Sequence, residues 1–320
     1  MVQKEELSFK SRDGETEIHA IRWIPEGEPK AILQIVHGMQ EYIDRYDDFA
    51  RYLAERGILV AGNDHLGHGQ SRPENGEYGY FCKYDAATVL VRDVHRLKKM
   101  TQEKYPGVPY IILGHSFGSF VTREYISRYG TGIDSVIIMG TGWTPGALIN
   151  VSKFLCKVQK LFLGDKHHAK MLNSIAFGTY LDKIDNPRTE FDWLSHNEES
   201  IDAYIANPAN NFVFTVNGFS TMAELLGRVE NYKKMGRIPK ELPILLIAGK
   251  EDPVGSYGEA VEKLYKIYKD ELQIKSVDLK LYDGMRHEIL NEEGKQEVYD
   301  DIVHFLDQEC EAAEPILAGK

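Results

Sequence analysis

Six short apolar segments, separated by stretches with helical periodicity, restrict the fold of this chain more than any other feature. Most are rich in Ile and Val and apolar on both faces, as strands covered by helices on either side must be. Because strand and helix alternate, the sequence predicts an α/β fold with a mostly parallel sheet. The segments are AILQIVH (31–37), ILVAGND (58–64), YIILGH (110–115), SVIIMG (135–140), PILLIAG (243–249) and VDLKLYD (277–283).

Two further strands are expected before these six. LSFK (7–10) and EIHAIRW (17–23) have the pattern of an antiparallel hairpin, since apolar and polar residues alternate in the second. The predicted sheet therefore has eight strands. Helices are expected to flank it over 47–57, 88–100 and 258–268, where apolar residues recur every three or four positions.

The alternation stops between about residues 143 and 240. VSKFLCKVQKLF (151–162) and KMLNSIAFGTYL (170–181) have helical periodicity, and no strong strand pattern appears there. We therefore expect an α/β core formed by residues 1–142 and 241–320, with a mainly helical cap over residues 143–240 covering the sheet. The apolar stripes of the cap are compatible with packing against the core and with lining a binding site.

The overall charge argues against nucleic acid as a partner. The chain has 38 Lys and Arg against 49 Asp and Glu, a formal net charge of -11, and no long basic run. The same charge weakly repels anionic lipid surfaces, so any lipid that the protein binds would be taken as a monomer or from a micelle rather than from an acidic bilayer, with transient lipid-surface contact at most. The sequence leaves the oligomeric state open.

No segment of the sequence has the apolar pattern of a signal peptide or of a membrane span. The first residues, MVQKEELSFK, lack the apolar core of a signal peptide, and the apolar runs elsewhere are of strand length. The three cysteines are far apart and form no CxxC pair, which disfavours a disulfide framework or a zinc knuckle. A cytoplasmic location is expected.

The segment PYIILGHSFGSF (109–120) carries the clearest chemical signal. It places GxSxG, with Ser116 at its centre, between a buried strand and a helix. In a nucleophile elbow the serine occupies a sharp turn at the carboxyl end of a strand, and the flanking glycines allow neighbouring chains to approach. Because the strand and the helix are both present, we predict Ser116 as a nucleophile rather than a serine in an ordinary turn.

A serine nucleophile needs an imidazole, and the imidazole needs a carboxylate that fixes its tautomer. In this fold the chain order is Ser, acid, His. Asp252 follows the strand 243–249 and precedes a Pro-Val-Gly turn, so we choose it over Glu251. His287 follows the last strand; nearby Asp283 is the other possible carboxylate partner, although its position before Gly284 suggests a turn.

Two backbone N–H groups are expected to bind the oxyanion of the intermediate. One belongs to Phe117, directly after the nucleophile. The other is assigned to Met39 in the loop HGMQEY (37–42), because Gly38 lets that backbone approach closely.

No metal or cofactor is expected. Asp64, His65 and His68 could suggest a metal site, but the embedded Gly67 and Gly69 match a structural loop of the protein family that the chain resembles. The glycines of GTG (140–142) lack the full dinucleotide-binding pattern and its acidic partner.

Six segments of the chain resemble the monoacylglycerol lipase and lysophospholipase group of α/β-hydrolases. The resemblance implies a cap over an apolar acyl tunnel and a small polar pocket for the alcohol. It also implies that Glu41 and Arg45 order the oxyanion loop or contribute to the alcohol pocket; an ordinary surface pair is the alternative. The segments are HGMQEYIDRYDDFA (37–50), NDHLGHGQS (63–71), GHSFGS (114–119), FDWLSHNEE (191–199), GKEDPVG (249–255) and DGMRHEILNE (283–292).

The expected activity is hydrolysis of lipid esters, monoacylglycerol or lysophospholipid, through an acyl-enzyme on Ser116. A general carboxylesterase, or a peptidase or amidase on the same scaffold, is the alternative. A peptidase would need acidic residues that bind a substrate amine, and Glu198, Glu199 and Asp202 leave this open. A non-catalytic ligand-binding relative is disfavoured because binding alone does not require a complete Ser, Asp and His set.

Overall fold

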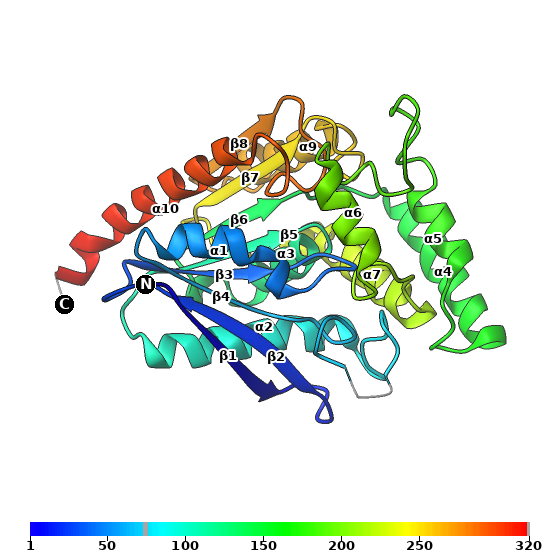
Figure 1. Cartoon of the computed structure of the whole chain (residues 1–320), viewed down its shortest axis with the longest axis horizontal. Helices are drawn as coiled ribbons and strands as arrows, with labels where there is room; N and C mark the ends of the chain where they lie inside the picture. Colours follow the sequence, from blue (N-terminus) through cyan, green and yellow to red (C-terminus); the bar gives the residue numbers. More distant parts are fainter. Residues whose placement is uncertain (73–75, 319–320) are drawn as a thin grey trace.

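An eight-stranded sheet forms the centre of the computed structural model, which describes residues 1–72 and 76–318 (Figure 1). The strand order is β1-β2-β4-β3-β5-β6-β7-β8, in which β2 pairs antiparallel with β1 and β4 and the remaining pairs are parallel. The predicted α/β-hydrolase sheet is confirmed. The strands are β1 (Gln3–Lys10), β2 (Glu17–Ile24), β3 (Ala31–Val36), β4 (Ile58–Asn63), β5 (Tyr110–His115), β6 (Ser135–Met139), β7 (Ile244–Gly249) and β8 (Val277–Tyr282).

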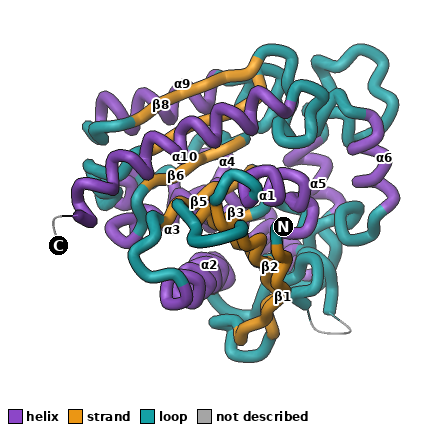
Figure 2. Tube along the Cα trace, turned by 60° about the vertical axis from the view of Figure 1, so that its left-hand side comes forward, coloured by secondary structure: helices purple, strands orange, loops and turns teal. Residues whose placement is uncertain are grey.

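The central strands are apolar on both faces because helices cover both faces (Figure 2). Every residue of β3 through β7 is buried, whereas β8 is buried at its two ends alone. One face packs against α1 (Asp47–Ala54) and α10 (Lys295–Ala318). The other face packs against α2 (Ala86–Lys104), α3 (Phe117–Tyr129) and α9 (Glu259–Lys266).

The helical segment expected after residue 143 lies between β6 and β7. Helix α7 packs against both α4 and α3, so this segment is joined to the core rather than standing apart (Figure 1). Asn197 and Thr215 cap α6 and α7, each accepting a hydrogen bond from a backbone N–H of the first turn at 3.2 Å. The helices are α4 (Gly146–Leu163), α5 (Lys170–Phe177), α6 (Glu198–Ala206), α7 (Val216–Val229) and α8 (Tyr232–Met235).

The apolar stripe of α4 divides between two environments. Ile149 and Cys156 are buried and face the interior. Phe154, Leu161 and Phe162 instead point outward, with 64%, 79% and 78% of their surface exposed. The apolar stripe was expected either to pack against the core or to line a binding site. Most of it does not pack against the core.

The described residues contain no helix that combines the length and the apolar composition required to cross a membrane.

Candidate active site

Ser116 occupies a strained turn between β5 and α3. Its backbone angles are φ 53° and ψ -121°, a region that side chains other than glycine rarely adopt. A Cβ on Gly118 would lie 2.0 Å from the carbonyl oxygen of Val36, and one on Gly114 would lie 2.3 Å from Thr122 Oγ1. The two glycines of the motif are therefore required for β5, α3 and β3 to meet behind the serine.

The structure brings His287 and Asp252 together. His287 lies in the loop after β8, and Asp252 in the loop after β7. The Nδ1 atom of His287 is 2.9 Å from Asp252 Oδ2, and both side chains are buried. The other carboxylate oxygen of Asp252 accepts the N–H of Val254 at 2.8 Å, which fixes the carboxylate orientation. Asp252 therefore engages Nδ1 of His287, and Nε2 of the same ring remains available for another hydrogen-bond partner.

The competing carboxylates have other partners. Glu251 lies 3.1 Å from His196 Nε2, and the exposed Asp283 pairs with Lys250 at 2.7 Å. Asp283 is close to His287 in sequence, yet Gly284, at φ 65°, turns the chain between them. The choice of Asp252 over both alternatives agrees with these contacts.

The two proposed oxyanion donors lie on either side of the serine. A Cβ on Gly38 would be 3.0 Å from Ser116 Cβ, so the loop that contains Met39 contacts the nucleophile directly. No acceptor for the N–H of Met39 or of Phe117 lies within the described part of the chain. Both residues line the same cavity as Ser116 and His287.

A largely apolar cavity of about 360 Å³ opens above the serine. Its apolar wall combines α3, α4, α5 and α7, and its polar end is formed by Glu41, His115, Glu288 and Tyr204. The wall includes Phe120, Ile149, Leu155, Leu172, Phe219 and Leu226. Arg45 does not line this cavity but lies behind its polar end.

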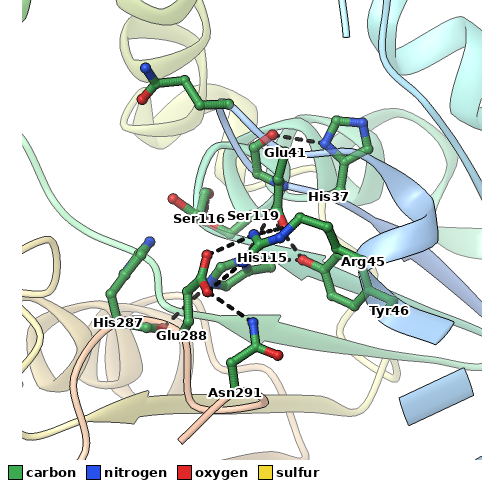
Figure 3. A network of polar contacts seen from close by, with 12 residues as sticks. His37, Glu41, Arg45, Tyr46, His115, Ser116, Ser119, His287, Glu288 and Asn291 are labelled. Carbon is green, nitrogen blue, oxygen red and sulfur yellow. Dashed lines mark hydrogen bonds and ion pairs between the residues drawn. The ribbon is translucent and has the colours of Figure 1, made fainter. Parts of the chain in front are cut away.

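Glu41 and Arg45 belong to a buried polar network (Figure 3). Arg45 forks onto Glu288, with both Nη atoms 2.8 Å from carboxylate oxygens, and its Nη1 also lies 3.2 Å from Glu41. Glu41 in turn is 3.0 Å from His115 Nδ1. The alternative of an ordinary surface pair is wrong, because a residue 243 positions away in sequence completes the network.

Buried charges in this network hold each other in the ionised form. Burial by itself raises the pKa of Glu288, but the charge of Arg45 and its hydrogen bonds lower it to about 2. Burial lowers the pKa of His115, yet the hydrogen bond and charge of Glu41 raise it overall. Burial raises the pKa of Glu41, and its contact with His115 reverses this so that the pKa is lowered.

Sequence reasoning did not identify His115 and Glu288 as part of the site. Each directly adjoins a predicted catalytic residue, His115 before Ser116 and Glu288 after His287. This adjacency in sequence was the only feature that could have indicated that they lie near the site. It could not reveal that the two side chains join one network, because their partners Glu41 and Arg45 come from the segment after β3.

The histidines considered for a metal have other partners. Asp64 accepts the N–H of Ile43 at 2.8 Å and that of Gln70 at 2.9 Å, so its carboxylate orders the loop. His65 and His68 are buried beside His37, with ring centroids 4.2 Å and 5.4 Å from its ring. Among the residues that the structure describes, no group of three or more His, Cys, Asp or Glu could hold a metal ion.

Comparison with known proteins gives one family. The model of the family described as serine aminopeptidase, S33 matches residues 27–294. Human monoglyceride lipase is 30% identical over 83% of this chain and 83% of its own length. The monoacylglycerol lipase of Mycolicibacterium smegmatis is 25% identical over 95% and 97%.

A solved structure extends the similarity to the whole fold. The carboxyl esterase of Bacillus coagulans, in complex with glycerol, is 30% identical to this chain, with a TM-score of 0.88 over 97% of this chain and all of the esterase. The chain belongs to the serine aminopeptidase, S33 family of α/β-hydrolases, and resembles monoglyceride lipases over most of its length.

Proposed function

We propose that this chain hydrolyses carboxylic esters of lipids, monoacylglycerols or lysophospholipids, through an acyl-enzyme on Ser116. The observation that carries the proposal is the 2.9 Å contact of Asp252 with His287, which lines the same cavity as the strained Ser116. The similarity to monoglyceride lipases and to a carboxyl esterase supports an ester substrate.

In the proposed reaction, His287 and Asp252 have the same roles in the acylation and in the deacylation of Ser116. His287 takes the proton of the Ser116 hydroxyl as its oxygen attacks the ester carbonyl, while Asp252 holds the imidazole in the tautomer that leaves Nε2 free. The N–H groups of Met39 and Phe117 bind the oxyanion. His287 then protonates the leaving alcohol, and water repeats the sequence on the acyl-enzyme.

We assign the acyl chain to the apolar wall and the alcohol to the polar end of the cavity. Glu41 contributes to that polar end, while Arg45 acts from behind it. Three of the four helices that supply the apolar wall, α4, α5 and α7, lie within residues 143–240, so we propose this segment as the cap of a core formed by residues 1–142 and 241–320.

Aminopeptidase chemistry is the second candidate because the family description names it. It would require a carboxylate that is free to bind the substrate amine. Glu198 and Asp202 are exposed on α6 and lie beside Arg188, with Asp202 2.7 Å from it, and neither these residues nor Glu199 lines the cavity. Glu41 and Glu288 do line it, but both are bound to cations. Ester hydrolysis is therefore favoured.

We also propose that the cap makes transient contact with a lipid surface. The exposed apolar side chains of α4 and α5, two of the helices that line the cavity, are here together called the apolar cap face; Leu148, Val151 and Ile175 among them also line the cavity. An apolar face of this kind lowers its free energy by inserting into the acyl region. It consists of Leu148, Val151, Phe154, Val158, Leu161, Phe162, Leu163, Met171 and Ile175.

A cytoplasmic location is part of the proposal. Its support is that Cys82, Cys156 and Cys310 are all free thiols, as is usual where the compartment is reducing.

Reaction with a fluorophosphonate tests the nucleophile. The wild-type chain should be labelled and the Ser116→Ala variant should not, because the probe forms its bond with an activated serine hydroxyl. A hydrolysis panel of monoacylglycerols, lysophospholipids, simple esters and aminoacyl anilides then ranks the substrates. Absence of labelling in the wild type, or a preference for anilides, would overturn the proposed ester hydrolase.

A further inference from the structure

We propose that Arg45 and Glu288 form a positioning strut between two loops of the active site. One loop carries the proposed oxyanion donor at Met39, and the other carries His287. The inference rests on the proposed function, since holding these loops together matters for an acyl transfer that takes place between them.

The contacts reach both loops within a few residues of the reacting groups. Glu288 directly follows His287, and its two oxygens each lie 2.8 Å from a different Nη atom of Arg45. Arg45 Nη1 also lies 3.2 Å from Glu41, whose other carboxylate oxygen accepts the N–H of Gly38. A bidentate guanidinium pair fixes direction as well as distance, so it can determine how the two loops are oriented.

The carboxylate of Glu41 has little capacity left for a substrate hydroxyl. A carboxylate offers about four acceptor positions. Glu41 already faces four donors, which are Gly38 N–H, Tyr46 O–H, one N–H of Arg45 and the ring of His115. This saturation favours a positioning role for the network over binding of the alcohol.

His115 completes the charge balance of the network. Its Nδ1 lies 3.0 Å from Glu41 Oε1, and its Nε2 lies 3.4 Å from the carbonyl oxygen of His287. Because both ring nitrogens face acceptors, the geometry favours an imidazolium that donates on both sides. Two carboxylates then face two cations, and the buried network is neutral (Figure 3). His115 also provides a second connection, besides the Arg45–Glu288 pair, between the backbone of His287 and the loop after β3.

The experiment removes both members of the strut together. An Arg45→Met and Glu288→Met double variant leaves no unpaired charge from the pair, and apolar replacement of a buried ion pair is tolerated by many folds. The matched control is Arg22→Met with Glu5→Met, which removes another partly buried pair, at 3.2 Å, on the β1–β2 hairpin. Each variant is assayed with p-nitrophenyl butyrate, which lacks a glycerol group, and with monobutyrin, and its melting temperature is measured.

The strut predicts a loss that does not depend on the alcohol. In the Arg45 and Glu288 double variant, kcat for both esters and the rate of fluorophosphonate labelling should fall by a similar factor of about 10²-fold, with KM little changed, because a small displacement of reacting groups has an effect of this size. The control should keep wild-type kcat. Arg45→Lys, which keeps the charge but loses the fork, should show an intermediate loss.

Two results would overturn the strut. If the double variant loses activity on monobutyrin alone, through a higher KM, the network is an alcohol subsite. If the folded double variant keeps the wild-type kcat, the network has no effect on catalysis. If the double variant does not fold, Arg45→Lys decides by the same comparison. Failure of the proposed function is a separate outcome, because the wild type itself would then be neither labelled nor active on either ester.

Discussion

Ser116 keeps a backbone conformation that costs free energy, and its neighbours explain how that conformation is held. Its N–H donates to Met139 O on the adjacent strand at 3.0 Å, and its carbonyl oxygen accepts the hydroxyl of Ser119 at 2.5 Å. Strained residues of this kind persist where the surrounding structure fixes them, and they are frequent at functional sites. The conformation supports the proposed role of Ser116 as the nucleophile.

Replacing Asp252 with Asn tests the proposed triad at the residue scale. The amide presents an N–H to His287 and thereby favours the wrong imidazole tautomer, so kcat for p-nitrophenyl butyrate should fall by about 10⁴-fold with little change in KM. Steady-state kinetics and a melting curve measure the effect. Asp283→Asn is the control, because this exposed residue pairs with Lys250 and should keep full activity. A loss below about tenfold in Asp252→Asn would contradict the assignment.

Prediction at this scale was most effective where chain order carries information. Ser116, Asp252 and His287 each follow a strand of the parallel sheet, and chain order therefore predicts them at its carboxyl edge; in the structure they follow β5, β7 and β8, and Asp252 contacts His287. Glu288 and His115 carry no such signal. Their roles depend on a contact with Arg45 and Glu41, and no local pattern specifies which distant loop supplies a partner.

At the scale of elements, α4 has two apolar sides with different environments. The inner side, with Ile149 and Leu155, lines the cavity, whereas the outer side is exposed. Helical periodicity predicted the helix and its apolar stripe correctly. It could not divide the stripe, because the position of α7 and α5 against α4 decides which residues are covered.

Polar substitutions on the apolar cap face test its proposed contact with lipid. Phe154→Ser, Leu161→Ser and Phe162→Ser together should lower binding to neutral phospholipid vesicles and hydrolysis of vesicle-borne monoacylglycerol by about 10²-fold, since each side chain contributes roughly 1 kcal/mol or more on insertion. Hydrolysis of monomeric p-nitrophenyl acetate should be unchanged. Vesicle co-sedimentation and the two assays measure this.

A surface control separates lipid contact from general loss of apolar area. Tyr84→Ser removes a side chain that is 71% exposed and belongs to the loop before α2, outside the apolar cap face. It should leave vesicle binding unchanged. Equal effects of the cap variant on vesicle and monomeric substrates would refute the proposed surface contact.

For the whole molecule, three buried histidines link stability to pH. Burial lowers the pKa of His37 well below its usual value, that of His65 to about 4 and that of His68 to about 3. In the unfolded chain they titrate near 6.5. At these three sites the unfolded state therefore binds more protons below that pH, and their contribution to the free energy of unfolding falls as the pH falls from 6.5 toward 4.

Carboxylates whose pKa is raised by burial oppose this contribution. Burial raises the pKa of Asp93 to about 6, above its unfolded value, so its contribution is present below about pH 4 and is lost as the pH rises through 6. Burial likewise raises the pKa of Glu230 to about 7 and that of Glu309 to about 6, so near pH 5 three carboxylates oppose the three histidines. The test therefore concerns the contribution of one histidine and not the net slope.

Removing one histidine should make the fold less sensitive to acid. His68 is surrounded by Phe81, Phe212 and Phe214, so Phe fits its site and cannot be protonated. Urea unfolding of His68→Phe between pH 7 and pH 4.5 should show a slope reduced by about 1.4 kcal/mol per pH unit. The exposed His304→Gln variant should keep the wild-type slope. An unchanged slope in His68→Phe would show that another group governs acid unfolding.

The sequence by itself determined the sheet, the order of its strands along the chain and the three positions from which the proposed reacting groups come. It could do so because apolar periodicity and motif spacing are local properties. Tertiary structure alone decided the contact between Arg45 and Glu288, the burial of His68 among aromatic rings and the outward side of α4. Each of these depends on which distant surfaces meet, and that outcome is fixed by packing over the whole chain.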